Sequence, residues 1–287
     1  MVLESFKTAT DAIDKPWHMF FIGIIYAVIA VFLSLWIFKQ YASLVMVFLT
    51  VFACVPLMYS TIKKQEVMDV TVKREGKIMK NHARVLEFLM FLFLGFVVAY
   101  SLVFIFLPSD LVEDLFSVQV ETIGAINSQI SGEVVNNAIN PSDFLGQIFF
   151  NNVKVLLFCV FFAFFYGAGA IFILTWNASV ISAAVGMFAK NRIAEYMASI
   201  GFIGAFGYFN VFTLGLLRYM IHGIPEILAY FVGGLAGGII SVAMINRDLE
   251  GNSFKIIMLD AIDLIILALF ILLVGGLLEV FVTPMFF

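Results

Sequence analysis

The residues best suited to chemistry stand in one short stretch, Arg218 to Glu226, within an otherwise apolar part of the chain. Arg218, His222 and Glu226 are spaced four residues apart, so an unbroken helix would place all three on one face. Gly223 is a common residue just past a helix end, and Pro225 is a common first-turn residue. The pattern therefore predicts a break between His222 and Glu226. Because ionisable side chains at membrane depth are costly, such a stretch is a candidate functional site.

Three interpretations of this stretch remain open. The first is a hydrogen-bonded corner in which Arg218 and His222 complement the C-terminal end of one helix, and Glu226 the N-terminal end of the next. The second is a polar site that binds a partner, a lipid head group or an ion. The third is a catalytic centre. The H-x-x-x-E spacing is not the zinc-binding H-E-x-x-H, and no phosphate-binding or nucleophile motif occurs. The sequence therefore predicts no catalytic residue, no metal site and no cofactor.

Four asparagines inside or at the ends of apolar runs join the candidate polar site: Asn151, Asn152, Asn177 and Asn210. Amide side chains at membrane depth usually hydrogen-bond a neighbouring helix or a broken stretch of backbone. Glu279 stands near the outer end of the last apolar run, where we expect water to solvate it.

The composition is that of a membrane protein. Of the 287 residues, 63% are hydrophobic and 13% are charged, whereas soluble domains average about 45–50% and about 25%. The excess has to face lipid, so the predicted fold class is an all-α, polytopic transmembrane helical bundle. A formal net charge of −4 argues against a nucleic-acid partner. Cys54 and Cys159 lie in apolar runs and are expected to be buried core residues.

The hydropathy pattern predicts about seven spans. Their approximate ranges are 17–38, 41–60, 86–107, 151–176, 193–217, the segment after Pro225 to Ile245, and 256–282. Residues 1–15 have the pattern of an amphipathic helix on the membrane surface. Residues 177–190 are too few for a span and fit a re-entrant or interfacial segment. The chain thus divides into 1–15, a three-span part 16–107, an acidic segment 108–150, and a four-span part 151–287.

The charges predict the orientation. Residues 61–85 carry seven Lys or Arg, and residues 108–150 carry six acids without Lys or Arg. By the positive-inside rule, loop 61–85 is cytoplasmic and segment 108–150 is extracytoplasmic. This puts 13 of the 16 Lys and Arg inside, Lys190 and Arg192 among them, with the N-terminus cytoplasmic and the C-terminus outside the cell membrane.

Segment 108–150 also contains an apolar stripe from Leu111 to Val134 at helical spacing. It predicts a long amphipathic helix that lies on the outer surface or roofs the bundle, followed by a short helix from Ser142.

Small residues that let helices approach closely are frequent in the C-terminal half. The glycines concerned are Gly167, Gly169, Gly233, Gly234, Gly237 and Gly238. Gly233/Gly237 and Gly234/Gly238 are two overlapping GxxxG pairs. They permit a homodimer and serve internal packing equally well.

Two of these stretches together resemble the stage II sporulation protein M family. The first is Asn151-Asn152, followed by Gly167-Ala-Gly169 and Asn177-Ala178. The second is His222-Gly223-Ile-Pro-Glu226, followed by the glycine-rich run. The resemblance covers about residues 145–245; the N-terminal third is similar in hydropathy only, and Ala178 replaces the family's usual glycine. The resemblance implies an integral membrane protein that is not an enzyme, because the family's sporulation members recruit or hold cell-wall hydrolases during engulfment. Other members occur in bacteria and archaea that make no spores.

The leading hypothesis is therefore a scaffold that anchors other membrane or cell-envelope proteins in the lipid bilayer through segments 108–150 and 61–85. One alternative is a permease or channel that moves a small solute or lipid past the polar residues, with the re-entrant segment and the broken helix lining its path. A second alternative is an intramembrane hydrolase that uses His222 and Glu226. A water-filled cavity at His222 would favour either alternative, and a dry packed corner would favour the scaffold.

Overall fold

The computed structural model describes residues 15–71, 75–136, 141–163, 168–245 and 252–286. The elements in these ranges are all helical, which confirms the predicted fold class. Seven of the described helices are long and apolar enough to cross a membrane. The amphipathic helix predicted for residues 1–15 falls outside the described residues except for its last position, and Gly167 also falls outside them.

The first three spans agree with the prediction. Helices α2 (His18–Ile37) and α3 (Ala42–Thr71) form a hairpin through the short helix η2 (Lys39–Tyr41), and α4 (Glu75–Phe106) follows. Segment 61–85, however, was wrongly predicted as a loop. It is helical as far as Thr71 and again from Glu75, because its many Lys, Glu, Met and Arg residues favour a helix.

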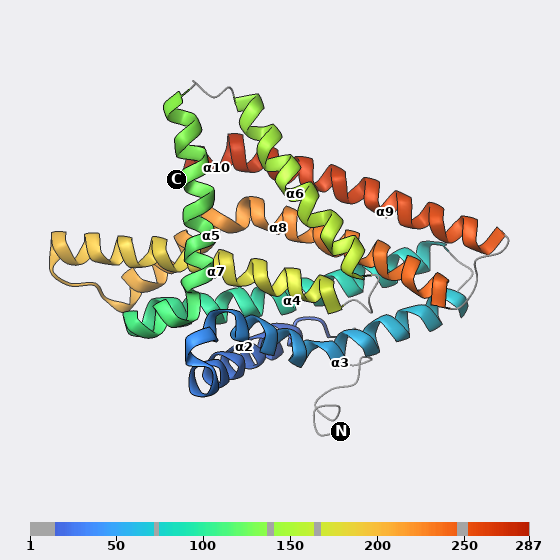
Figure 1. Cartoon of the computed structure of the whole chain (residues 1–287), viewed down its shortest axis with the longest axis horizontal. Helices are drawn as coiled ribbons and strands as arrows, with labels where there is room; N and C mark the ends of the chain where they lie inside the picture. Colours follow the sequence, from blue (N-terminus) through green and yellow to red (C-terminus); the bar gives the residue numbers. More distant parts are fainter. Residues whose placement is uncertain (1–14, 72–74, 137–140, 164–167, 246–251, 287) are drawn as a thin grey trace.

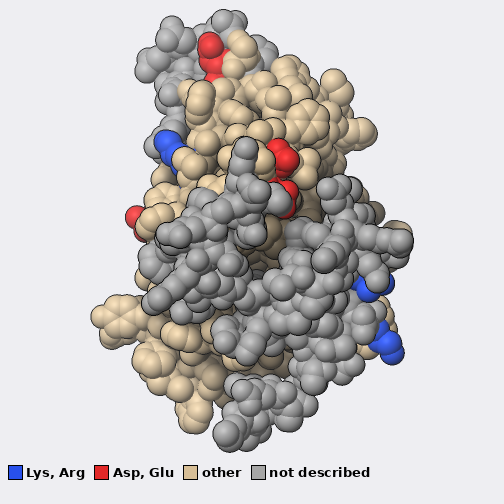
Figure 2. Space-filling view, turned by 90° about the vertical axis from the view of Figure 1, so that its right-hand side faces the viewer, with Lys and Arg blue, Asp and Glu red and all other residues tan. Residues whose placement is uncertain are grey.

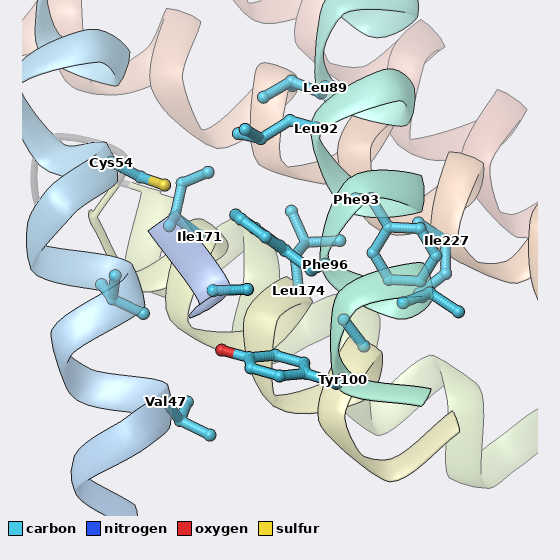
Figure 3. Packing of buried hydrophobic residues seen from close by; sticks show 14 of the residues in the cluster. Val47, Cys54, Leu89, Leu92, Phe93, Phe96, Tyr100, Ile171, Leu174 and Ile227 are labelled. Carbon is cyan, nitrogen blue, oxygen red and sulfur yellow. The ribbon is translucent and has the colours of Figure 1, made fainter. Parts of the chain in front are cut away.

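Helix α4 is the centre of the bundle. In its most apolar stretch 61% of the residues are buried, compared with 28% in α2. Phe96 and Tyr100 of α4 point toward side chains of α3 and α7, whereas Phe93 points toward Ile227 of α8 (Figure 3). The Tyr100 hydroxyl lies 2.6 Å from Thr50 Oγ1 of α3, so the buried polar atoms of both side chains are satisfied. Both cysteines, Cys54 and Cys159, are free and buried, as predicted.

Helix α5 (Ser109–Asn136) crosses one end of the bundle, here called the α5 end (Figure 1). Its Gln119 is fully buried. Gln119 Oε1 accepts a hydrogen bond from Ser43 Oγ of α3 at 2.7 Å, and Gln119 Nε2 donates to Ser179 Oγ at 3.1 Å. Lys39 and Asp114 form an ion pair of 3.6 Å at the same end. The sequence predicted that this helix lies either on the outer surface or across the end of the bundle, and the structure shows it packed across the end, on α3 and α7.

The boundaries predicted between residues 141 and 245 are wrong. The structure has three long helices here: α6 (Pro141–Ala163), α7 (Ala168–Ile200) and α8 (Ala205–Ile245). The short helix expected from Ser142 is the beginning of α6, and residues 151–176 are divided between α6 and α7. Residues 177–190 are neither re-entrant nor interfacial, because they continue α7. The last helix, α9 (Asn252–Leu277), continues through the π-helical segment η3 (Leu278–Val282) into α10 (Thr283–Phe286).

The turn that was expected at Gly223 occurs about twenty residues earlier. Gly201 has φ of 75°, and its N–H donates to the Met197 carbonyl at 3.0 Å, so a left-handed glycine ends α7. Residues 193–217 are therefore two helices rather than one span. Helix α8 instead runs through Gly223 and Pro225 without a break. A proline is tolerated inside a membrane helix when neighbouring helices cover the freed backbone groups.

Helix α7 runs parallel to α4. Ser182 Oγ donates to the Val97 carbonyl at 3.0 Å, and Lys190 Nζ lies 5.3 Å from the centre of the Phe104 ring, near the end of α4. Lys190 and Arg192 consequently lie at the α5 end, and their predicted place on the side of segment 61–85 is wrong. Eleven of the 16 Lys and Arg still support the predicted orientation.

The surface carries many large apolar side chains. Phe32, Phe52 and Phe270, from three different helices, are each more than 60% exposed. In the view of Figure 2 most of the described surface is uncharged. Such a surface suits contact with lipid, where apolar side chains need no covering.

Two of the predicted packing glycines bring α8 against α6. A Cβ atom at Gly233 would meet Leu156, and one at Gly237 would meet the backbone carbonyl of Val160. Gly238 has nothing within 4 Å of its Cβ position, and Gly234 is half-buried. Gly233 and Gly237 therefore serve packing inside the chain.

Replacing Gly237 by alanine should destabilise the bundle by about 1–3 kcal/mol, because the methyl group would overlap backbone of α6. Gly238→Ala is the matched control and should be neutral or stabilising, since alanine favours a helix over glycine. Thermal unfolding of the purified proteins in detergent measures both. Equal unfolding midpoints for the two variants would contradict the close α6–α8 contact.

Candidate functional site

His222, Glu226 and Tyr230 follow one another at four-residue spacing along α8. Because α8 is continuous here, the three side chains lie on one face of the helix. Tyr230 is fully buried, and His222 and Glu226 are half-buried. This face is covered by α6 on one side and by α9 on the other, so the polar groups meet partners from both helices.

The partner from α6 is Asn152. Its Nδ2 donates to Glu226 Oε1 at 2.6 Å, and its Oδ1 accepts a hydrogen bond from the Tyr230 hydroxyl at 2.8 Å. Both the NH2 group and the oxygen of the Asn152 amide are therefore hydrogen-bonded, which fixes the orientation of the amide between two side chains of α8. Asn152 is 8% exposed. A buried amide and a half-buried carboxyl that satisfy each other avoid the cost of leaving either group without a partner away from water.

The partners from the last helix are Glu279 and Thr283. Gly275 lies against Glu226, with its Cβ position 3.1 Å from Glu226 Cγ, and His222 Nδ1 lies 3.2 Å from Thr283 Oγ1. Glu279 is placed midway, one turn from Gly275 and one from Thr283. Its carboxyl group faces that of Glu226.

The π-helical segment contains Glu279 and is followed directly by Thr283. Thr283 Oγ1 also donates to the Leu278 carbonyl, five residues earlier, at 3.1 Å. Widened turns of this kind are rare and occur often at functional sites. Here the extra residue in the turn accompanies the placement of two polar side chains against α8.

These six residues form what we call the polar cluster: Asn152, His222, Glu226, Tyr230, Glu279 and Thr283. It brings together three of the seven predicted site residues, Asn152, His222 and Glu226. The other four lie elsewhere. The Arg218 guanidinium lies over the rings of Phe188 and Tyr219, at 5.5 and 5.9 Å. Asn177 Nδ2 donates to the Ile173 carbonyl of its own helix at 2.8 Å. Asn151 and Asn210 are exposed.

Sequence reasoning missed Tyr230, Glu279 and Thr283, and it was wrong to expect Glu279 to face water. The signal was present as spacing. Tyr230 continues the four-residue series of His222 and Glu226, and Glu279 and Thr283 form a second such series with Gly275. Hydropathy alone does not reveal this spacing, because Glu279 stands near the end of an apolar run, where carboxyl groups commonly reach water.

The polar cluster can form hydrogen bonds and exchange protons. Within the described parts of the chain, no three His, Cys, Asp or Glu side chains gather in a way that could hold a metal ion. The hydrogen bonds join α6, α8 and the end of the last helix, which comprises η3 and α10. Two carboxyl groups in contact can in addition share a proton.

Comparison with known families completes the description. The family model of stage II sporulation protein M matches residues 84–284. The chain belongs to this family. The match is wider than the stretch 145–245 that carried the resemblance. It includes α4 from residue 84 onward, α5 through η3 and the whole polar cluster, while α2 and α3 precede it. Comparison with curated proteins and with solved structures finds no match.

Replacing Asn152 by leucine should destabilise the protein by about 2 kcal/mol, because Glu226 would lose a donor and Tyr230 an acceptor in a buried site. Asn151→Leu provides the matched control, since the neighbouring side chain is exposed. We expect this change to be neutral or stabilising. Thermal unfolding in detergent gives the comparison. The proposed link between α6 and α8 would be refuted if Asn152→Leu unfolded no earlier than the control.

Proposed function

We propose that this family member is a membrane scaffold without enzymatic activity, which holds a cell-envelope protein at its α5 end. The positive-inside rule supports the orientation, because it puts segment 61–85 in the cytoplasm and the α5 end outside the cell membrane. The N-terminus is then cytoplasmic and the C-terminus extracytoplasmic.

The observation that carries this proposal is the exposed turn between α7 and α8. We call residues 194–210 the hairpin apex. Every residue from Ala194 to Ile200 is exposed, and Phe202, Phe206 and Phe209 are 73%, 80% and 66% exposed. The one charged residue in the apex, Glu195, forms an ion pair of 3.0 Å with Arg192. A helix end outside the membrane that exposes several large apolar side chains together normally has a partner.

The hairpin apex projects beyond its neighbours. Helix α4 ends at Phe106, two residues after the Phe104 ring that Lys190 contacts, and α7 continues for ten residues beyond Lys190. At 1.5 Å per residue this is about 15 Å, and Figure 1 shows the end of α7 extending past the other helices at the α5 end. Lys190, Arg192 and Arg218 surround the base of the projection. Basic side chains commonly reach the head-group level of a membrane, so the apex would lie outside the hydrocarbon layer.

Helix α5 supplies a second outer surface at the same end. Asp110, Glu113 and Glu121 are exposed along its outer edge, while Leu115 and Phe116 are buried against the bundle. A partner protein that fits both surfaces would offer an apolar patch for the apex beside basic residues for α5. This agrees with the hypothesis that the acidic segment is a docking surface. Whether segment 61–85 holds a cytoplasmic partner, and whether the chain forms a homodimer, stay predictions.

A photo-crosslinking amino acid at position 202 tests the proposal in native membranes. The expected product is a protein adduct of one discrete mass, because the partner would cover Phe202. The same amino acid at position 32 is the control, since Phe32 is equally exposed but lies on α2 and should meet lipid. Phe202→Ser with Phe206→Ser should then abolish the adduct formed from a probe at position 200 without changing the unfolding midpoint. Lipid adducts alone at both positions would contradict a protein partner.

A permease or channel is the second candidate, and the polar cluster at membrane depth favours it. It predicts that liposomes containing the protein pass a small solute or exchange lipid between leaflets, and that Glu226→Gln changes the rate at unaltered stability. Equal rates in protein-free liposomes and in liposomes with wild-type protein would count against it. An intramembrane hydrolase using His222 and Glu226 stays a prediction.

A further inference from the structure

The contact between α8 and the C-terminal helix places two carboxyl groups face to face inside the membrane-spanning region. The two helices run in opposite directions, because Glu226 meets Gly275 while His222 meets Thr283, eight residues later. Glu279 lies between these two contact points and on the same face as both. Its position opposite Glu226 thus follows from the packing of the two helices.

A hydrogen bond between two carboxyl groups requires one proton. A carboxylate only accepts hydrogen bonds, so one of the two groups must keep its O–H and donate it to the other. The second donor to Glu226 is the neutral Asn152 amide, which satisfies an oxygen but brings no charge. If both groups lost their protons, two negative charges would face each other in a partly buried site, and they would repel each other.

The other titratable groups around the pair come from the elements packed against it. Helix α8 contributes His222 and Tyr230, and α6 contributes Cys159, which is close to Tyr230. Arg218 lies two turns before Glu226 on α8, with its guanidinium over the rings of Phe188 and Tyr219. Its positive charge is close enough to His222 for the two side chains to interact electrostatically. The last helix contributes Glu279 itself.

We propose that the Glu226–Glu279 pair is a proton-dependent latch that keeps the C-terminal helix, residues 272–286, docked on α8. With one shared proton the carboxyl groups bind each other and the helices stay together. When the proton leaves, repulsion between the carboxylates pushes the C-terminal helix away from α8. The docked form therefore holds one more proton than the undocked form. Docking is favoured at low pH and weakens as the pH rises. This proposal does not depend on the partner suggested for the hairpin apex.

Infrared spectroscopy of the protein in liposomes tests whether the proton is present. The wild type should show the C=O stretch of a carboxylic acid at neutral pH, shifted when water is replaced by D2O. The double variant Glu226→Gln/Glu279→Gln should lack this band, while Glu195→Gln, which changes an exposed carboxylate, should retain it. A wild type without the band, or a double variant that keeps it, would overturn the latch. The wild-type spectrum alone decides the matter if the double variant does not fold.

Hydrogen–deuterium exchange of residues 272–286 tests whether the proton controls docking. At alkaline pH these residues should exchange faster in the wild type than in the double variant at the same pH, because glutamine stays neutral. The difference should grow by up to tenfold for each pH unit between the pH at which the carboxyl groups of the undocked form ionise and the higher pH at which the docked pair loses its proton, and it should level off above that, as expected for one linked proton. Glu195→Gln should behave like the wild type. Equal exchange in the wild type and the double variant at every pH would show that the pair does not control the helix.

Discussion

The hydrogen bonds between Asn152, Glu226 and Tyr230 are the constraint on which the C-terminal half of the bundle depends. In the hydrocarbon layer no water is present to satisfy a carboxyl or an amide, so each polar group has to find a protein partner. Because Glu226 is on α8, α6 must place a hydrogen-bond donor opposite it, which fixes both the position of α6 along α8 and the rotation of α6 about its own axis. Gly233 and Gly237, about two and three turns further along α8, then let α6 come close enough for the bond to form. The polar cluster and the close packing thus support each other.

Hydropathy predicted the N-terminal spans well because their ends carry unambiguous signals. Lys39 separates the first two helices, and Pro108 follows the third. Between residues 141 and 245 the same reasoning failed, because several glycine-containing stretches compete as turns. Gly201 adopts a left-handed conformation and ends a helix, whereas Gly223 and Pro225, which have the stronger local pattern, remain helical. The packing of α6 and α9 on α8 decides this, and it is not visible in local sequence.

The candidate site was predicted in part for the same reason. His222 and Glu226 were found because charged residues in an apolar run attract attention, and Asn152 was found for its polarity. The choice between Asn151 and Asn152 depends on which side of α6 faces α8, and that is a property of the assembled bundle. Glu279 was misjudged because nearness to the end of a span says nothing about which face of the helix carries the side chain.

The order of the helices in space has a consequence for how the chain is made. The central helix α4 packs on α2, which precedes it, and also on α7, which is synthesised roughly sixty residues after α4 is complete. Contacts between distant parts of a chain form late and slow the folding of a protein. Until α7 enters the membrane, the side of α4 around Val97 lacks the neighbour that it has in the finished bundle, whereas Phe104 can already pack on Phe116 of α5. Insertion of α7 is thus the step during biosynthesis at which the two halves of this protein become one structure.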